Sequence, residues 1–440
     1  MDQSYMKKDK ILPLLLKMAL PMVISMMVNS LYNIVDSLFV AKLSENAMTA
    51  LSLVFPVQNL INSVMVGFGI GINSLISFYM GAQNNKMANK AASQGMFLAT
   101  IHGVIFTVVS IIIMPSFLKL FTSDTDVINL GVQYSNIAFA FSVILAWELV
   151  FEKTFQAVGR MKVSMVCMMT GCIVNIVLDP IMIFGIGFIP AMGIQGAALA
   201  TGIGQTTCAI MYLVLYKLRP IPVKYKRQYI KLEKGICGKL YSVGIPASLN
   251  MALPSLQVSV LNIILSSYSQ VYVFILGVYY KLQTFLYLPA NGVVQGMRPL
   301  IGYNYGAGEH KRVHKIYNTA LALVVAIMAV GTILCLSRPT KLIALFTINT
   351  DTINIGAIAL RIISAGFIVS TVSVVSSGAL EGLGKGMPSL IISLCRYVII
   401  MLPVAFIASL IYGANGVWNA FWVTELISAI IAHILFKRVK

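Results

Sequence analysis

The sequence predicts an all-α polytopic membrane protein, with twelve transmembrane helices in two parallel six-helix repeats. Charged residues make up only 10% of the 440 residues, whereas hydrophobic residues make up 58%. Apolar stretches long enough to cross a bilayer recur along the chain, and its two halves match at one constant offset. Soluble proteins average about 25% charged residues. This composition therefore excludes a soluble globular enzyme and a disordered chain.

The helices are located by stretches without charge. A spanning helix needs about 20 apolar residues, and the ranges 91–118, 127–147, 316–337 and 397–424 contain no charged residue. These apolar runs are continuous, which excludes a β-barrel, whose strands alternate apolar with polar residues. We expect helices near residues 15–40, 47–78, 89–114, 128–151, 163–185, 194–216, 239–267, 271–298, 314–336, 353–378, 388–410 and 415–436.

The first apolar segment is predicted to be a retained helix rather than a cleaved signal peptide. Lys17 and Pro21 interrupt the run, and no small-residue cleavage site follows it. The six cysteines are scattered and form no Cys-x-x-Cys motif. We therefore expect neither disulfides nor a cysteine metal site.

The basic residues predict the orientation. With twelve helices, one side of the membrane would carry 24 Lys and Arg residues, including the basic stretch 217–239, and the other side only 4. The positive-inside rule then places both termini in the cytoplasm. The net charge of +18 is thereby explained by contacts with anionic lipid headgroups of the bilayer. No folded basic module is present, so nucleic acid is not an expected partner.

The internal repeat defines two lobes. The segments Phe121–Gly131 and Phe346–Gly356 are identical at 7 of 11 positions, and Pro21 falls on Pro246 at the same offset. We predict an N-lobe over residues 1–216 with helices 1–6, a basic cytoplasmic linker over 217–238, and a C-lobe over 239–440 with helices 7–12. Each lobe has an even number of helices, so the repeats run parallel. Rocking of two such halves about a midplane site gives alternating access.

Polar residues inside the first lobe predict an ion site. A charge at the bilayer centre costs about 2.5–3.5 kcal/mol on insertion scales, so each one needs a reason. Tyr32 and Asp36 lie on one face of helix 1, and Asn175 lies one turn before Asp179 on helix 5. Carboxylate, amide and hydroxyl oxygens suit a proton or a hard cation such as Na⁺. The alternative is a hydrogen-bonded cluster that only aids packing. The predicted ion-coupling residues are Asp36, Asp179, Asn175, Tyr32, Tyr134 and Thr201.

The second lobe carries different charges. Leu261 and Val404 stand at the repeat equivalents of the two aspartates. Lys281 and Glu425 are predicted to lie deep and to pair with each other near the central cavity, since an unpaired buried charge is costly. Arg361 and Arg396 lie nearer a membrane face, where they could also snorkel. We predict that Lys281, Glu425, Arg361 and Arg396 line the substrate cavity.

Three motifs resemble the multidrug and toxic compound extrusion (MATE) family across almost the whole chain. The Asn-x-x-x-Asp-Pro pattern is the most specific and indicates the DinF-like, MepA-like bacterial branch. The motifs are Leu31–Val40, Asn175–Phe184 and Gly302–Ala307. This resemblance implies two six-helix lobes in a V shape, and coupling-ion binding at the N-lobe cluster. The NorM-like branch instead uses acids on helices 7 and 10, and the ranges predicted here for those helices contain none.

The resemblance implies a secondary active multidrug exporter, not an enzyme. It would exchange amphipathic, often cationic drugs or toxic compounds for inward H⁺ or Na⁺, with no cofactor beyond that coupling ion, and would contribute to antibiotic resistance. We expect a monomer in the bacterial inner (plasma) membrane. The alternative is a flippase for a lipid-linked saccharide with the same fold, which cations in the cavity would favour. A membrane-embedded enzyme would need a nucleophile–base or metal constellation, and the sequence shows none.

Overall fold

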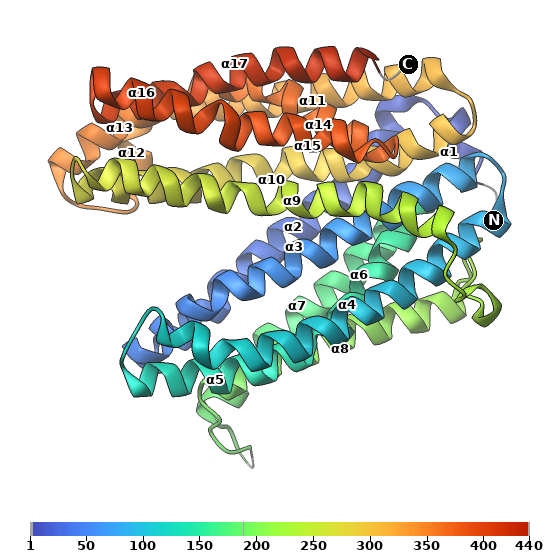
Figure 1. Ribbon diagram of the computed structural model, residues 1–440, viewed down its shortest axis with the longest axis horizontal. Helices are drawn as coiled ribbons and strands as arrows, with labels where there is room; N and C mark the ends of the chain where they lie inside the picture. Colours follow the sequence, from blue (N-terminus) through green and yellow to red (C-terminus); the bar gives the residue numbers. More distant parts are fainter. Residues whose placement is uncertain (1–2, 188, 439–440) are drawn as a thin grey trace. The chain divides into compact units, whose positions relative to one another are not determined.

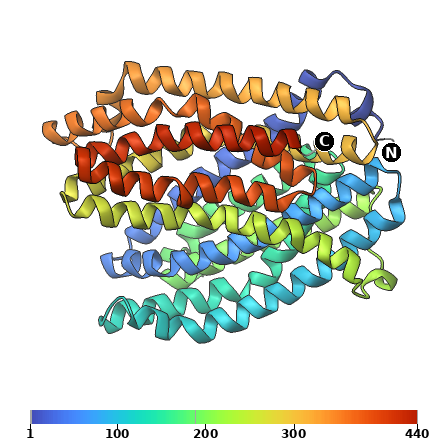
Figure 2. The ribbon, with the colours of Figure 1, turned by 45° about the horizontal axis from the view of Figure 1, so that its top comes forward.

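The computed structural model describes residues 3–187 and 189–438, and these fold into helices joined by short loops (Figures 1 and 2). Residues 1–2 and 439–440, at the limits of the two expected lobes, lie outside the described residues. The first half contains α1 (Tyr5–Lys8), α2 (Ile11–Ala41), α3 (Glu45–Gly81), α4 (Asn85–Lys119), α5 (Thr125–Ala140), α6 (Ser142–Ala157), α7 (Met161–Phe184), α8 (Ile194–Leu218) and η1 (Arg227–Tyr229). The second contains α9 (Lys234–Ser266), α10 (Gln270–Gly306), α11 (His310–Ser337), α12 (Pro339–Ala344), α13 (Thr350–Ser364), α14 (Phe367–Gly382), α15 (Gly386–Leu394), η2 (Cys395–Ile399), α16 (Met401–Tyr412) and α17 (Ala414–Arg438).

The described residues agree with the twelve expected spans, but two of these spans are broken. Within residues 3–187 and 189–438, ten helical segments are long and apolar enough to cross a membrane, and the two bent helix pairs raise the total to as many as twelve. The fourth span is α5 and α6 with a 44° bend, and the tenth is α13 and α14 with a 52° bend. At the first bend, the carbonyl of Phe139 accepts hydrogen bonds from the hydroxyls of Thr107 (2.9 Å) and Ser142 (2.7 Å). These hydrogen bonds pair the Phe139 carbonyl, which the break leaves outside the regular hydrogen-bond pattern of the helix.

The chain forms two compact units. The first contains Gln3 and Ile24–Ser248; the second contains Ser4–Val23 and the chain from Leu249 onward. The unit limits differ from the expected lobe limits at 216 and 239, because the first parts of α2 and α9 pack with the other half of the sequence. Small residues permit this packing, since they let backbones approach closely.

The packing repeats in the same register as the sequence. In the first unit, a Cβ added to Gly67 of α3 would lie 2.3 Å from the Ser248 backbone nitrogen. In the second, a Cβ added to Gly292 of α10 would lie 2.9 Å from the Val23 nitrogen. The two glycines occupy equivalent positions of the repeat that pairs Pro21 with Pro246, and so do their two partners. The duplication therefore preserves this close contact between helix backbones in each unit.

The segment between α8 and α9 is attached to the first unit. Side-chain oxygens of Asn89, Ser93 and Gln94 on α4 accept hydrogen bonds from its backbone N–H groups at 2.6, 3.0 and 3.1 Å. The Lys90 ammonium also pairs with Glu233 at 2.6 Å. This stretch therefore follows a defined path on the surface of α4, and α9 begins at Lys234, earlier than expected.

The two ends of the second unit's chain lie at the same end of that unit (Figures 1 and 2). Arg312, near the start of α11, donates to the carbonyl of Met6 in α1 at 3.2 Å. Phe436, near the end of α17, stacks on Tyr317 of α11 with ring centroids 3.9 Å apart. An even number of spans between these two ends of the described chain agrees with that arrangement.

Candidate functional site

The first unit gathers polar groups where α7 and α8 cross. The Asn175 amide donates to Oδ1 of Asp179 and to the hydroxyl of Thr201, both at 3.3 Å. The helices approach closely because glycines face each other: a Cβ on Gly171 would lie 2.9 Å from the carbonyl oxygen of Gly204. Any larger side chain there would separate the helices and move Asn175 away from Thr201.

The second carboxyl of the cluster comes from α2. Asp36 lies within hydrogen-bonding reach of Asp179. Asp179 is fully buried and Asn175 is 2% exposed. Among the described residues, Oδ1 of Asp36, Oδ2 of Asp179 and Oδ1 of Asn175 are shielded acceptors without a protein donor. Two carboxyl groups at this separation need a shared proton or a cation between them, because two bare carboxylates repel.

Two tyrosines complete the cluster. Tyr32 lies one turn before Asp36 on α2, and the two groups interact electrostatically. Tyr134 on α5 is 2% exposed, interacts with both carboxyls, and hydrogen-bonds Gln58 of α3. The structure therefore places all six candidate ion-site residues in one cluster of the first unit, drawn from α2, α5, α7 and α8.

In the second unit, Glu425 pairs with Arg396 and not with Lys281, so the predicted Lys281–Glu425 pair is wrong. The Arg396 Nε donates to the two carboxylate oxygens at 2.7 and 3.0 Å, and Nη2 lies 2.7 Å from Oε1. The planar guanidinium fork matches a carboxylate with several bonds at once, which an ammonium cannot do. The Lys281 side chain is instead exposed, with its Nζ 5.9 Å from the centre of the Phe346 ring.

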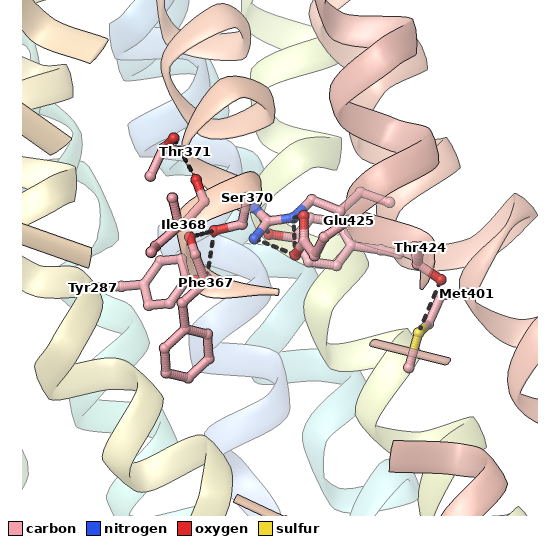
Figure 3. Close-up of polar contacts among 10 residues, drawn as sticks. Tyr287, Phe367, Ile368, Ser370, Thr371, Met401, Thr424 and Glu425 are labelled. Atoms are coloured by element: carbon pink, nitrogen blue, oxygen red, sulfur yellow. Dashed lines mark hydrogen bonds and ion pairs between the residues drawn. The ribbon is translucent and has the colours of Figure 1, made fainter. Parts of the chain in front are cut away.

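Tyrosine rings lie near this ion pair, and Figure 3 shows Tyr287 with Ser370 and Glu425 in one view. The Arg396 guanidinium lies 6.0 Å from the Tyr287 ring centre and 5.3 Å from that of Tyr397. The Tyr287 hydroxyl shares a 2.7 Å hydrogen bond with Ser370 of α14. Arg396 is 8% exposed, which counts against the alternative that it snorkels to a membrane face. Arg361, by contrast, is exposed on α13.

A π-helical turn positions Arg396. The expected single helix 388–410 is divided into α15, the π turn η2 and α16, and Arg396 lies inside η2. A π turn inserts one extra residue per turn and is frequent at functional sites. The shift rotates Arg396 relative to the rest of the helix. No charge or spacing pattern in the sequence indicates this turn.

Two carboxyl groups were missed by the sequence analysis. Glu381 lies in α14, beyond residue 378, where helix 10 was expected to end, so this span does contain an acid. The Glu381 carboxylate pairs with Arg298 at 2.7 Å and accepts a hydrogen bond from the Asn250 amide at 3.0 Å. Glu148 lies inside the expected helix 4, between α7 and α8. Its position in a charge-poor apolar run, one turn before Glu152, was the available signal.

Comparisons with known proteins agree with this architecture. The MatE family model matches residues 21–181 and 246–407. Multidrug export protein MepA of Staphylococcus aureus (strain MSSA476) is 26% identical over 98% of this chain and 94% of its own length. Multidrug export protein MepA of Staphylococcus haemolyticus (strain JCSC1435) is 23% identical over 97% and 94%.

Two solved structures show the same fold. One is an outward-facing multidrug resistance MATE family transporter of the MOP superfamily, with a TM-score of 0.92, 22% identity, and coverage of 100% of this chain and 98% of that one. The other is a MOP superfamily transporter from Pyrococcus furiosus Vc1 (DSM3638), described as having a binding pocket of reverse polarity that suggests a different function. Its TM-score is 0.91 at 23% identity, with coverage of 100% and 98%.

Proposed function

Because this chain belongs to the MatE family, we propose that it is a secondary active multidrug exporter, a transporter and not an enzyme. It expels amphipathic, often cationic compounds in exchange for inward flow of H⁺ or Na⁺. The resemblance to the MATE family, expected from three motifs, is confirmed by the family model and by the full-length match to multidrug export proteins. The chain is accordingly a multi-pass membrane protein.

The carboxyl pair carries the proposal for ion coupling. Asp36 and Asp179 come from two different helices, and the cluster presents three shielded oxygens without protein donors. An ion bound between the carboxyls cancels their repulsion and holds α2 against α7. Release of the ion restores the repulsion and weakens that packing. Differential binding of the ion to two packing states is what allows its gradient to bias a conformational equilibrium.

The tyrosine-surrounded pair in the second unit is proposed to contribute to substrate recognition. Glu425 and the rings of Tyr287 and Tyr397 offer a carboxylate and aromatic faces, the groups that attract organic cations. When such a compound binds to Glu425, Arg396 would release this carboxylate and take another partner. Lys281 and Arg361 have exposed side chains, and their place in the substrate cavity stays a prediction.

The pairing of Arg396 also bears on the flippase alternative. That reading depended on three cations, Lys281, Arg361 and Arg396, in a cavity that would attract the phosphate groups of a lipid-linked saccharide. Glu425 neutralises Arg396, which removes one of these three cations from the attraction for phosphate. This pairing favours export of neutral or cationic compounds.

We expect a monomer in the bacterial plasma membrane, with both termini in the cytoplasm. The asymmetry of 24 basic residues on one side against 4 on the other supports this orientation. Single cysteines placed in residues 217–239 of a cysteine-free protein should react with an impermeant thiol reagent only from the cytoplasmic side. Labelling of this stretch in intact cells would contradict the orientation.

Transport in liposomes tests the function. Purified protein should move the dye ethidium against its gradient when an H⁺ or a Na⁺ gradient is imposed alone, and the effective gradient identifies the coupling ion. A lipid-linked saccharide analogue and a fluorescent phospholipid serve as comparison substrates in the same vesicles. Lipid movement without gradient-driven dye transport would replace the exporter by the flippase.

A further inference from the structure

A third carboxyl group, Glu148, lies partly buried within the first unit at the middle of α6. Its Oε2 is shielded from solvent and has no hydrogen-bond partner among the described residues. The carboxyl lies within hydrogen-bonding reach of the Cys208 thiol of α8. The titratable groups that face it from α2, α7, α8 and its own helix are Tyr32, Cys167, Cys172, Cys208 and Glu152.

None of these facing groups carries a positive charge. The nearest lysine along α6, Lys153, is already paired with Glu152 at 2.7 Å. A Glu148 carboxylate would therefore be an unbalanced charge in an apolar interior, and such groups at membrane depth mark ion pathways and proton relays more often than they stabilise a fold. Thiols surround it, and thiols are poor ligands for a hard cation such as Na⁺. The surroundings thus suit a proton.

Along the helix direction, Glu148 lies between the depth of the ion site and the end of α6. It precedes the last residue of α6, Ala157, by two and a half turns, or about 14 Å at the helical rise of 1.5 Å. Asp179 follows the first residue of α7, Met161, by five turns, or about 27 Å. A short turn joins these two helix ends, so they lie on one side of the membrane. Glu148 is therefore about halfway from the carboxyl pair to that side.

Hydrogen-bonding side chains of α2 and α7 lie between the ion site and Glu148. On α2, one turn before Asp36, the Asn33 amide donates to the carbonyl and side-chain oxygens of Asn29 at 2.7 and 3.3 Å. Asn29 in turn hydrogen-bonds the Cys172 thiol, which faces Glu148.

The polar groups continue beyond Glu148 toward the end of α6. One turn further on, Glu152 accepts a hydrogen bond from the Gln156 amide at 2.6 Å. The hydroxyls of Thr154 and Tyr225 lie 2.8 Å apart, and Tyr225 belongs to the segment between α8 and α9. This segment is the basic stretch that we assign to the cytoplasm. A row of polar groups thus extends from the carboxyl pair to the predicted cytoplasmic surface.

We propose that Glu148 carries protons between the Asp36–Asp179 pair and the cytoplasm. This proposal rests on the exporter function above, with H⁺ as the coupling ion. In the first step protonated Glu148 gives its proton to water at the cytoplasmic end. In the second step an O–H bond of the pair breaks, and a new O–H bond forms on the Glu148 carboxylate through intervening hydroxyl, thiol or water groups. Proton and charge balance without another reactant, and the unbalanced carboxylate exists only between the two steps.

The test measures proton-driven ethidium transport in liposomes, with the pH on the cytoplasmic face varied and the opposite face held constant. Glu148→Gln should lower the gradient-driven rate by at least about tenfold and remove its dependence on cytoplasmic pH. Ethidium binding and dye exchange without a gradient should be unchanged. Glu148→Asp should restore part of the rate. Glu45→Gln, the same change at an exposed site on α3, should behave as the unmodified protein does.

Three results would overturn the proposal. A full rate and unchanged pH profile in Glu148→Gln would show that the proton does not use this group. Loss of folding or ethidium binding in both Glu148→Gln and Glu148→Asp would assign it a structural role. Transport driven by Na⁺ alone and insensitive to Glu148→Gln would reject the relay but leave the exporter in place. Failure of the exporter itself is distinct, because the unmodified protein would then show no gradient-driven transport.

Discussion

Asp36→Asn is expected to abolish gradient-driven export while the protein still folds and still binds ethidium. Asparagine has nearly the same shape as a protonated aspartic acid but cannot carry the charge that holds an ion or exchanges a proton. Loss of a charged ligand weakens an interaction by about 1.5–3 kcal/mol, or roughly 10- to 150-fold in ion binding. The transport rate under an H⁺ or Na⁺ gradient, compared with ethidium binding to the same preparation, checks this expectation.

The same substitution at an exposed site is the control. Asp126 lies in the first turn of α5 with its side chain in the open, so Asp126→Asn should leave the transport rate unchanged. Asp179→Asn should impair transport, and to a smaller extent if Asp36 is the principal ion ligand. Full export by a well-expressed Asp36→Asn protein would remove the carboxyl pair from the coupling mechanism. Glu425 would then be the next carboxyl to test.

Arg396→Met is expected to destabilise the second unit strongly. It leaves Glu425 as an unpaired charge inside the protein, and breaking a buried pair from one side typically costs about 3–5 kcal/mol. The double substitution Arg396→Met with Glu425→Gln should recover most of that loss, because no charge is then left behind. Melting temperatures and yields of monodisperse protein in detergent, measured for both single variants and the double variant, give the coupling.

Lys281 supplies the matched control for this cycle. Its side chain is exposed, with the ammonium 5.9 Å from the centre of the Phe346 ring, so Lys281→Met should change the melting temperature little. If the effects of Arg396→Met and Glu425→Gln simply add, the ion pair contributes no interaction energy. If Lys281→Met lowered the melting temperature more than Arg396→Met does, the result would favour the Lys281–Glu425 pair that the sequence predicted.

The number and class of the helices follow from the sequence. Hydrophobic length and charge exclusion act along the chain itself, since a bilayer requires about 20 apolar residues per crossing and makes each charge expensive. The internal repeat likewise follows from the order of residues alone, and it reappears in the packing of Gly67 and Gly292. The two bends, at Phe141 and after Ser364, were not predicted, because each bent pair is predominantly apolar and no proline stands at the break.

The candidate ion site was predictable to a large extent. Asp36 and Asp179 each interrupt an otherwise apolar run, and helical spacing places Tyr32 and Asn175 one turn from them. That Asn175 reaches Thr201 depends on Gly171 and Gly204, which bring α7 and α8 close enough for the amide to bridge them. The sequence contains these glycines but does not say which helices they join.

The charges of the second half show where sequence reasoning ends. Depth along a helix made Lys281 and Glu425 equal candidates for a pair, since both lie equally far from the start of their helices. The partner was decided by the direction in which each side chain points, and the π turn at Cys395–Ile399 turns Arg396 toward Glu425. The sequence by itself thus determined the membrane class, the twelve spans, the repeat and the two aspartates Asp36 and Asp179 of the first half. Only the tertiary structure decided which charges pair and that Glu148 faces α7 and α8, because contacts between helices depend on rotation and crossing, which no pattern within one helix encodes.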